Sequence, residues 1–242
     1  MPGEYRGKKQ MDKLYIVMPA YNEEENIESV VREWYSVLVG DDSRLIVADS
    51  GSTDGTHDIL VKLQKELPKL EIISDTLKQH GPKLIALYEY AIKSGADWVF
   101  QTDSDGQTSA TEFEAFWKIR NQYDAIIGYR PNRGDGKKRA FVEKVVCLLL
   151  KFYFRVNIPD ANAPFRLLKT ELVNKYLGRL PRDYSLPNIM LTTYVVYYNE
   201  KVDFEEISFK PRMKGKNSID FIKIIKIGCK ALGDFHRFKK TM

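Results

Sequence analysis

The feature that most constrains the fold of this chain is an alternation of short apolar runs with segments of helix length. Runs rich in β-branched residues occur at 14–18, 45–48, 71–73, 98–100 and 125–127. Apolar residues recur at three- and four-residue steps, as in amphipathic helices, within the intervening segments 27–39, 56–67, 83–93 and 111–122. Strands and helices alternating at this spacing predict an α/β fold, with a mostly parallel central sheet flanked by helices on both faces.

Polar clusters directly follow several of the predicted strands. Residues 19–23 follow the first strand, residues 49–56 the second and residues 103–107 the fourth. The carboxyl ends of parallel strands meet at one edge of a sheet, and ligands bind outside that edge. The sequence therefore predicts one binding site built from these loops.

The acidic triplet Asp103-Ser104-Asp105 is the part of this site with the most specific chemistry. Carboxylates one residue apart at a strand end can converge, with a nearby amide oxygen, on one hard divalent cation. Such a cation would neutralise a diphosphate, which indicates a nucleotide-activated substrate. Taken alone, such a triplet is more often a solvated turn, and only the neighbouring loops favour the metal site.

The loop at residues 49–56 combines small residues with carboxylates. Small residues let the backbone approach a ligand closely, and carboxylates accept hydrogen bonds from a base or a ribose. We expect Asp49, at the strand end, to contact the ligand. Asp54 and Thr56 are expected to form the turn and cap the next helix.

These motifs together resemble those of the family 2 glycosyltransferases, which have the Rossmann-like GT-A fold. Residues 17–24 are similar to the P-x-Y-N-E opening of that family, and residues 49–56 to its D-D-G-S-x-D-G-T segment, with Ser50 in place of the second acid. Residues 103–105 take the place of its metal-binding D-x-D. The resemblance implies a glycosyltransferase domain over residues 14–218, after a polar extension at 1–13 and before a C-terminal helix at 219–242.

Further segments are similar to the polyprenyl-phosphate sugar synthase branch, which includes dolichyl-phosphate mannose synthases and bacterial polyprenyl-phosphate glucosyltransferases. They are Gln107 after the D-x-D and residues 128–130, 160–169 and 211–218. The Q-x-x-R-W signature of processive polysaccharide synthases is absent from the sequence, which disfavours a chain-extending synthase.

The resemblance implies a donor nucleotide and a metal ion bound side by side. The implied nucleotide contacts are Pro19, Ala20, Tyr21, Glu23, Asp49, Asp103 and Ser104. The implied metal ligands are Asp103, Asp105 and Gln107, with Asp105 as the principal one, and an all-oxygen set fits Mg²⁺ or Mn²⁺. Lys83 is a further nucleotide candidate, left open because residues 80–83 depart from the family's Gly-Lys-Gly-like turn. His80 is interpreted as a loop residue.

On the acceptor side, Arg130 and Arg139 match arginines that grip a phosphate in this branch, a task that suits a planar guanidinium. The alternative is a basic surface loop, which residues 131–139 resemble. Arg212 would swing onto the donor diphosphate. A phosphate acceptor needs no general base, whereas a sugar hydroxyl does. Asp160 is the candidate base, with a structural acid as the equal alternative.

The C-terminal segment has an apolar helical face, formed by Phe221, Ile224, Ile225, Gly228, Leu232 and Phe235. Basic residues lie largely elsewhere on the same helix. A basic amphipathic helix of this kind could lie on an anionic bilayer. The alternative is that its apolar face docks on the domain.

The predicted function is a metal-dependent, inverting glycosyltransferase that moves a sugar from a nucleotide sugar, by preference UDP-linked, to polyprenyl phosphate or a lipid-linked glycan. One alternative is transfer to a hydroxyl of a cell-surface polysaccharide or teichoic-acid-like chain. Another is a catalytically silent nucleotide-sugar-binding subunit. Intact Asp103, Asp105, Gln107 and Arg212 argue against that subunit.

Bulk properties limit the expected partners and location. A net charge of +5 is too small to indicate a nucleic-acid partner. Residues 1–13 lack the apolar core of a signal peptide, and no apolar stretch approaches the roughly 20 residues of a spanning helix. The expected location is the cytoplasm, including the cytoplasmic face of the membrane. Peripheral membrane contact and a homodimer are both compatible with the sequence.

Overall fold

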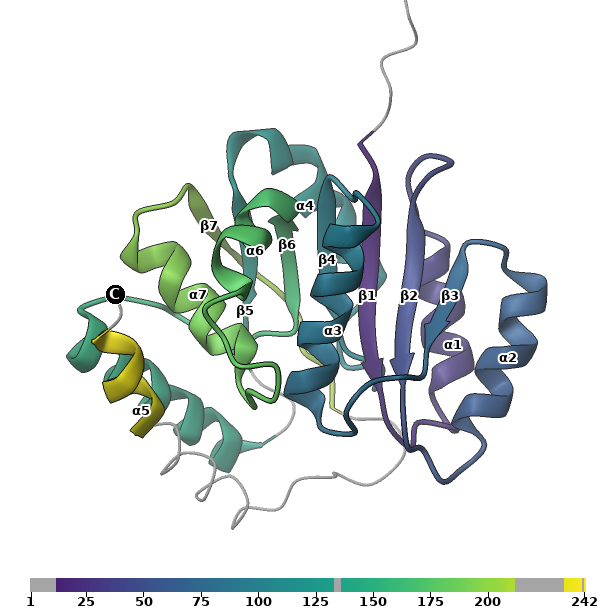
Figure 1. Ribbon diagram of the computed structural model, residues 1–242, viewed down its shortest axis with the longest axis horizontal. Coiled ribbons are helices and arrows are strands. Elements are labelled where there is room, and N and C mark those ends of the chain that lie inside the picture. Colours follow the sequence, from purple (N-terminus) through teal and green to yellow (C-terminus); the bar gives the residue numbers. More distant parts are fainter. Residues whose placement is uncertain (1–11, 133–135, 212–232, 241) are drawn as a thin grey trace, which may run out of the picture.

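The computed structural model of the protein describes residues 12–132, 136–211, 233–240 and 242. Its centre is a seven-stranded sheet of order β3-β2-β1-β4-β6-β5-β7 (Figure 1). The strands are β1 (Leu14–Ala20), β2 (Arg44–Asp49), β3 (Leu70–Ile73), β4 (Trp98–Thr102), β5 (Ala125–Tyr129), β6 (Phe165–Lys169) and β7 (Val202–Glu206). Only β6 runs antiparallel to its neighbours, β4 and β5. The predicted α/β class with a mostly parallel sheet is confirmed.

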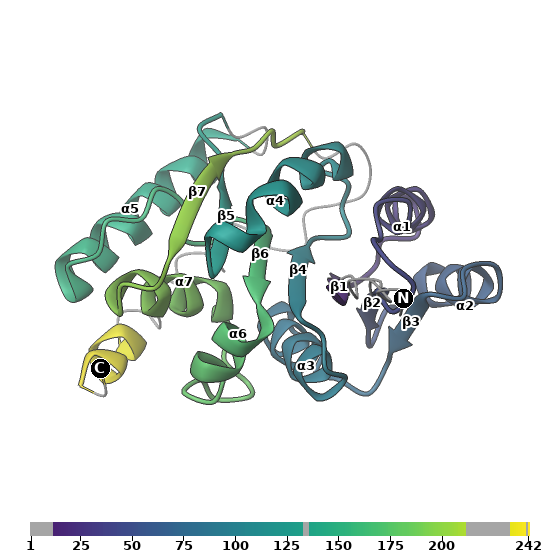
Figure 2. The ribbon, with the colours of Figure 1, turned by 90° about the horizontal axis from the view of Figure 1, so that it is seen from above.

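Helices cover both faces of this sheet (Figure 2). One face carries α1 (Ile27–Tyr35), α2 (Thr56–Glu66) and α4 (Phe113–Ile119). The other carries α3 (His80–Lys93), α6 (Thr170–Leu177) and α7 (Pro187–Tyr197). Helix α5 (Lys137–Phe154) lies at the β7 end of the molecule and contacts α7.

Two hydrophobic clusters, one on each face of the sheet, form the core. The α1 side is rich in aromatic residues: Trp34, Phe100 and Phe165 pack with ring centroids 4.7–5.8 Å apart. The α3 side joins α3, α6, α7 and the inner face of α5. Because successive strand side chains point to opposite faces, each buried strand contributes to both clusters.

The five predicted strands are confirmed, and so are the helices between them, with shifted ends. The helix predicted over 27–39 ends at Tyr35, and the one predicted over 111–122 is a short α4 flanked by 3₁₀ turns. The loop predicted over 131–139 is wrong at its end, because α5 begins at Lys137. Gly136, with φ of 102°, makes the turn into that helix.

The described part of the C-terminal segment, residues 233–240, packs on the domain. Phe235 is buried against Tyr153 and Phe154 of α5, with ring centroids 6.4 and 5.8 Å away. Of the predicted apolar face, Phe235 alone lies within the described residues, and it supports the docking alternative. Within those residues, no helix combines the length and the apolar character needed to span a bilayer.

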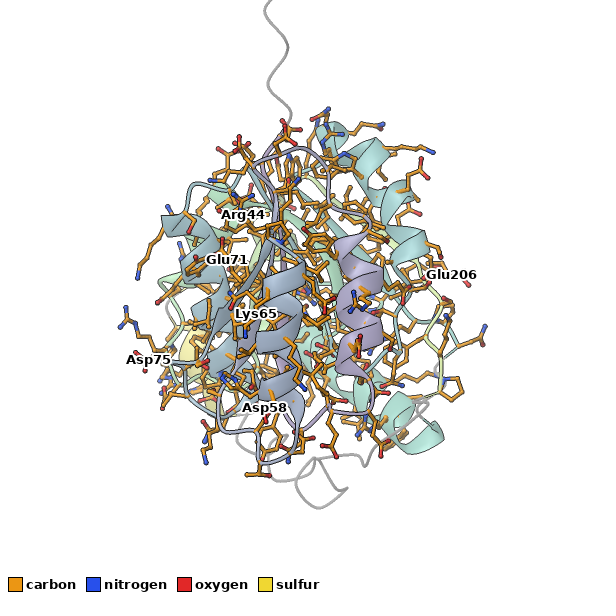
Figure 3. All side chains as sticks on the ribbon, turned by 90° about the vertical axis from the view of Figure 1, so that its right-hand side faces the viewer. Arg44, Asp58, Lys65, Glu71, Asp75 and Glu206 are labelled. Carbon is orange, nitrogen blue, oxygen red and sulfur yellow. The ribbon has the colours of Figure 1, made fainter. Side chains whose placement is uncertain are left out.

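The two ends of the parallel strands differ in what they present (Figure 3). Arg44, at the start of β2, pairs with Glu71 of β3 at 3.4 Å and lies toward one end of the sheet. Asp58, in the first turn of α2, and Asp75, after β3, lie toward the other end. That second end, the carboxyl edge, carries the predicted site loops.

Candidate functional site

The loops after β1, β2 and β4 meet at the carboxyl edge, as the sequence predicts. The order of strands reverses at β1, which lies between β2 and β4, and such a switch point opens a crevice for ligands. Ser104 ties the β4 loop to β1, because its Oγ donates to the Pro19 carbonyl at 2.8 Å. Pro19 and Ser104, two predicted nucleotide contacts, are therefore in direct contact.

The β1 and β2 loops are fastened to each other by side chains. The Asn22 backbone has a φ of 54°, and its Oδ1 accepts from the Thr53 amide at 2.8 Å. Glu24 Oε2 accepts from the Gly55 amide at 2.8 Å. Asp54 Oδ1 accepts from the Thr56 amide at the start of α2, which confirms the predicted turn. The predicted cap is wrong, because the N-cap of α2 is Gly55 and Thr56 is the first helical residue.

Asp49 and Glu23, predicted to contact the donor, are both buried and held by protein donors. Asp49 accepts from Ser52 Oγ on one oxygen, and its other oxygen lies 3.1 Å from His57 Nδ1. Glu23 Oε2 accepts from Asn26 Nδ2 at 3.0 Å. Both carboxylates thus hold the loops in shape. Their contact with a nucleotide stays a prediction.

Lys83, whose role as a nucleotide contact the sequence left open, has its side chain at the same carboxyl edge. It lies in the first turn of α3, where it is buried, and its Nζ donates to the carbonyl of Ala20 at the end of β1. The Tyr21 ring, which is exposed, lies 5.3 Å from the same ammonium. Burial lowers the pKa of Lys83 to about 8, although the charge of Asp49 opposes the shift.

The first turn of α3 can reach this position because Gly81 has no side chain. A Cβ at Gly81 would lie 2.3 Å from the backbone oxygen of Tyr184. Its neighbour His80, interpreted from the sequence as a loop residue, is the first residue of α3 instead. The imidazole Nε2 of His80 lies 3.5 Å from Asp103 Oδ1.

Replacing Lys83 by methionine is expected to remove part of the pH dependence of stability. The Lys83 pKa is about 8 in the folded protein and 10.5 as its reference value. Between these values the unfolded chain binds more protons, so the free energy of unfolding rises with pH, by about 1–2 kcal/mol from pH 8 to 10. Below about pH 7 the amine is protonated in both states and adds no slope.

Urea unfolding at pH 7, 8 and 10 would measure this difference between the two proteins. Lys62→Met, at an exposed lysine of α2, is the matched control and should keep the wild-type slope. Parallel pH profiles for Lys83→Met and the wild type would contradict the expectation.

Asp103, Asp105 and Gln107 line the loop after β4. Asp103 Oδ1 accepts from Gln101 Nε2 at 3.2 Å, and Asp105 Oδ1 accepts from the Gln107 amide at 3.1 Å. Asp103 keeps 26% of its side chain exposed. Loss of surrounding water nevertheless raises the pKa of Asp103, and the charge of Asp105 raises it further.

This donor set fits a divalent cation. Two carboxylates that oppose each other's ionisation are relieved when they share a positive charge. Gln107 Nε2 donates to the Lys210 carbonyl at 2.8 Å, which leaves the amide oxygen for a ligand. Within the described residues, no group of three His, Cys, Asp or Glu side chains gathers as a metal site.

A buried polar network below Asp103 was not assigned a role from the sequence. Asn188 of α7 donates to Gln101 Oε1 at 3.0 Å and accepts from the Tyr88 hydroxyl at 3.1 Å. The fully buried Arg166 donates to the carbonyls of Asn188 and Ala163 at 3.1 and 2.9 Å. The one signal in the sequence is an arginine inside the apolar run 165–168. This network fixes Gln101, and through it the orientation of Asp103.

Arg130 and Asp160 form a buried ion pair at the neighbouring end of β5. Arg130 Nε and Nη2 donate to the two Asp160 oxygens at 2.6 and 2.9 Å, and the Arg130 amide donates at 3.3 Å. The Phe209 ring lies 4.7 Å from the guanidinium. Of the two interpretations of Asp160, this geometry supports the structural acid. The guanidinium keeps Nη1 for another acceptor.

Two arginines predicted to bind phosphate groups remain, Arg139 and Arg212. Arg139 lies half-buried in the first turn of α5. Arg212, expected on the donor diphosphate, lies outside the described residues.

Comparison with known proteins matches residues 15–177 to the model of a family described as glycosyl transferase family 2. A curated relative from Photorhabdus laumondii, named undecaprenyl-phosphate 4-deoxy-4-formamido-L-arabinose transferase, is 23% identical over 90% of this chain and 66% of its own length. A relative of the same name from Salmonella paratyphi B is 27% identical over 72% of this chain and 54% of its own length. The chain spans about half to two thirds of these relatives.

Solved structures of glucosyl-3-phosphoglycerate synthase from Mycobacterium tuberculosis have a similar fold. The complex with UDP gives a TM-score of 0.68 at 17% identity, over 98% of this chain and 86% of that one. The complex with Mn²⁺, UDP and phosphoglyceric acid gives a TM-score of 0.70 at 17% identity, over 93% and 78%. At this level of identity, the similarity extends to the fold alone.

Proposed function

Because this chain belongs to glycosyl transferase family 2, we propose that it transfers a sugar from a UDP-sugar to polyprenyl phosphate or a lipid-linked acceptor, with inversion at the anomeric carbon. The observation that carries the proposal is the meeting of Asp103, Asp105 and Gln107 with the β1 and β2 loops at the carboxyl edge of the sheet. We assign the reaction to residues 14–218.

The donor side is supported by the way the loops hold one another. A nucleotide at the switch point would meet the exposed Tyr21 ring, which can stack on a base, and the Lys83 ammonium behind it. Asp49 and Glu23 are fixed by protein hydrogen bonds, so they would present oxygens of settled orientation to the ribose and base. Such preorganisation lowers the ordering cost of binding.

The diphosphate would lie beside the loop after β4, residues 103–107, which we call the acidic loop. Asp105, Asp103 and Gln107 would hold Mg²⁺ or Mn²⁺, which supplies positive charge to the departing nucleoside diphosphate. Arg212, from its place in the sequence, would add a second positive charge there. The buried network of Gln101, Asn188 and Arg166 keeps the Asp103 carboxylate in place while charge develops.

The acceptor side is supported by the Arg130–Asp160 pair. Asp160 accepts through both oxygens from Arg130, so it orients the guanidinium toward a phosphate rather than standing ready to take a proton. A phosphate monoester is already an anion and attacks without a base. A sugar-hydroxyl acceptor would need another proton acceptor, which makes polyprenyl phosphate the preferred class. The names of the curated relatives support the same class.

A panel of UDP- and GDP-sugars, incubated with the protein and undecaprenyl phosphate, tests this proposal. Mass spectrometry of the lipid fraction should detect one sugar added per lipid phosphate, with Mn²⁺ or Mg²⁺ present and not with EDTA. Each reaction has a parallel in which the lipid phosphate is replaced by undecaprenol. A product from the alcohol as large as that from the phosphate would contradict the phosphate acceptor.

A second readout separates the donor from the acceptor. Metal-dependent release of UDP without a lipid product would keep the donor half of the proposal and reject the polyprenyl phosphate. No release of nucleoside diphosphate from any donor would reject the transferase proposal as a whole.

A further inference from the structure

The outward face of α5 is apolar and open to solvent. Phe141, Val145, Leu148 and Phe152 are 66, 37, 66 and 77% exposed, and we call them the α5 stripe. At 3.6 residues per turn they fall within about 60° of one another, on a strip about 16 Å long. The opposite face, with Leu150 and Phe154, is buried in the core. These four side chains gather on one strip rather than being scattered singly, which makes the strip a candidate interaction surface.

Basic side chains line one flank of the α5 stripe. Lys144, Lys151 and Arg155 are exposed and follow the same helical turns as the apolar residues. None of the three pairs with an acidic side chain in the described part of the chain. The one acid of α5, Glu143, faces inward, where its Oε1 accepts from the Ala161 amide at 2.9 Å. Among the described residues of α5, the outward face therefore carries apolar and basic side chains and no acidic one.

The α5 stripe begins beside the candidate acceptor site. Phe141 lies two residues after Arg139, and Glu143 on the next turn binds the 160–163 loop. That loop contains Asp160, the partner of Arg130. A surface in contact with the stripe would thus lie next to the arginines expected to meet an acceptor phosphate.

We propose that the α5 stripe and its basic flank bind the surface of an anionic phospholipid bilayer, with α5 lying in the plane of the interface. Apolar side chains enter the boundary of the acyl chains, while lysines extend along the helix to reach the headgroups. The positive flank is complementary to phosphatidylglycerol headgroups. The contact places the carboxyl edge at the membrane.

A second copy of this chain is a poorer occupant. The stripe covers about 160 Å² as a strip about 16 Å by 10 Å, whereas a stable dimer buries about 800 Å² on each partner. Two copies meeting face to face would also bring equal basic flanks together, which repel each other.

Flotation of the full chain with vesicles tests the proposal. The wild type should float with vesicles of phosphatidylcholine and phosphatidylglycerol, and Leu148→Glu/Phe152→Glu should reduce the floated fraction about tenfold or more. Val61→Glu/Leu77→Glu, at exposed apolar positions outside the stripe, is the matched control and should float like the wild type. Circular dichroism and thermal unfolding check that all variants remain folded.

The basic flank has its own test. Lys144→Gln/Lys151→Gln should lose most of the preference for phosphatidylglycerol over pure phosphatidylcholine, and Lys62→Gln/Lys65→Gln on α2 should keep it. A wild type that does not float, or a folded stripe variant that floats as well as the wild type, would overturn the proposal. A third result would also overturn it: light scattering shows that the wild type is a dimer and the stripe variant a monomer, while both proteins float equally well.

This inference does not rest on the proposed reaction. Flotation needs no donor and no metal, so the bilayer contact stands or falls separately from sugar transfer.

Discussion

Replacing Asp105 by alanine is expected to lower sugar transfer by at least about a hundredfold, because the carboxylate expected to hold the cation against the diphosphate is removed. The stability of the folded protein should change by less than about 1 kcal/mol, because the lost hydrogen bond from the Gln107 amide is offset by the loss of a repulsion. Asp105 raises the pKa of Asp103, so removing its charge relieves a repulsion in the folded state. Transfer and thermal unfolding are measured on the same preparation.

The matched control for this variant is Asp75→Ala. Asp75 is an exposed acid that follows β3 at the carboxyl edge, outside the acidic loop (Figure 3). It should keep wild-type transfer. Titration of Mn²⁺ in the presence of UDP should show weakened metal binding for Asp105→Ala alone. Near-wild-type turnover by Asp105→Ala would contradict the assignment of Asp105 as a metal ligand.

Replacing Asp160 by alanine is expected to cost about 3–5 kcal/mol of unfolding free energy, because it leaves the Arg130 guanidinium buried without its counter-charge. Asp160 accepts from Arg130 at 2.6 and 2.9 Å, and both side chains are almost wholly buried. Denaturant unfolding measures the loss. Glu28→Ala, which breaks an exposed pair with Arg32, is the control and should change stability by less than about 1 kcal/mol.

Two further variants separate the two interpretations of Asp160. Arg130→Met/Asp160→Leu removes both buried charges and should recover most of the lost stability, while transfer to undecaprenyl phosphate stays low because the phosphate-binding guanidinium is gone. If Asp160 were instead a general base, Asp160→Asn, whose side-chain oxygen can still accept from Arg130, would abolish transfer while keeping most of the stability that Asp160→Ala loses. That result would restore the sugar-hydroxyl acceptor.

The strands and the location of the site could be predicted because they follow from local patterns. A run such as 45–48 is apolar on both sides and short, which indicates a strand buried on both faces. Parallel strands then bring their carboxyl ends together whatever the details of packing. Asp54 and Thr56 form their turn within three residues, so this turn was also predictable from the sequence.

The strands β6 and β7 escaped prediction because their sequences carry no such local signal. Arg166 interrupts β6 with a charge whose partners come from α7 and from the 161–163 loop. In β7, Asp203, Glu205 and Glu206 make an edge strand look like a surface loop. Only pairing with β5, far away in the sequence, makes this segment extended.

What the sequence by itself determined is the parallel sheet, the carboxyl edge with its acidic loop, and the family whose motifs lie there. The tertiary structure decided which charges meet and which surfaces stay open. Asp160 finds Arg130 across 30 residues, Asn188 supports Gln101 across 87, and the α5 stripe has no covering element among the described residues. The physical reason is the distance along the sequence over which each effect acts. Periodicity and capping act within a few residues, whereas burial and ion pairing depend on which segments pack together. The acidic loop was therefore visible from the sequence, but the partner of Asp160 and the exposed face of α5 were not.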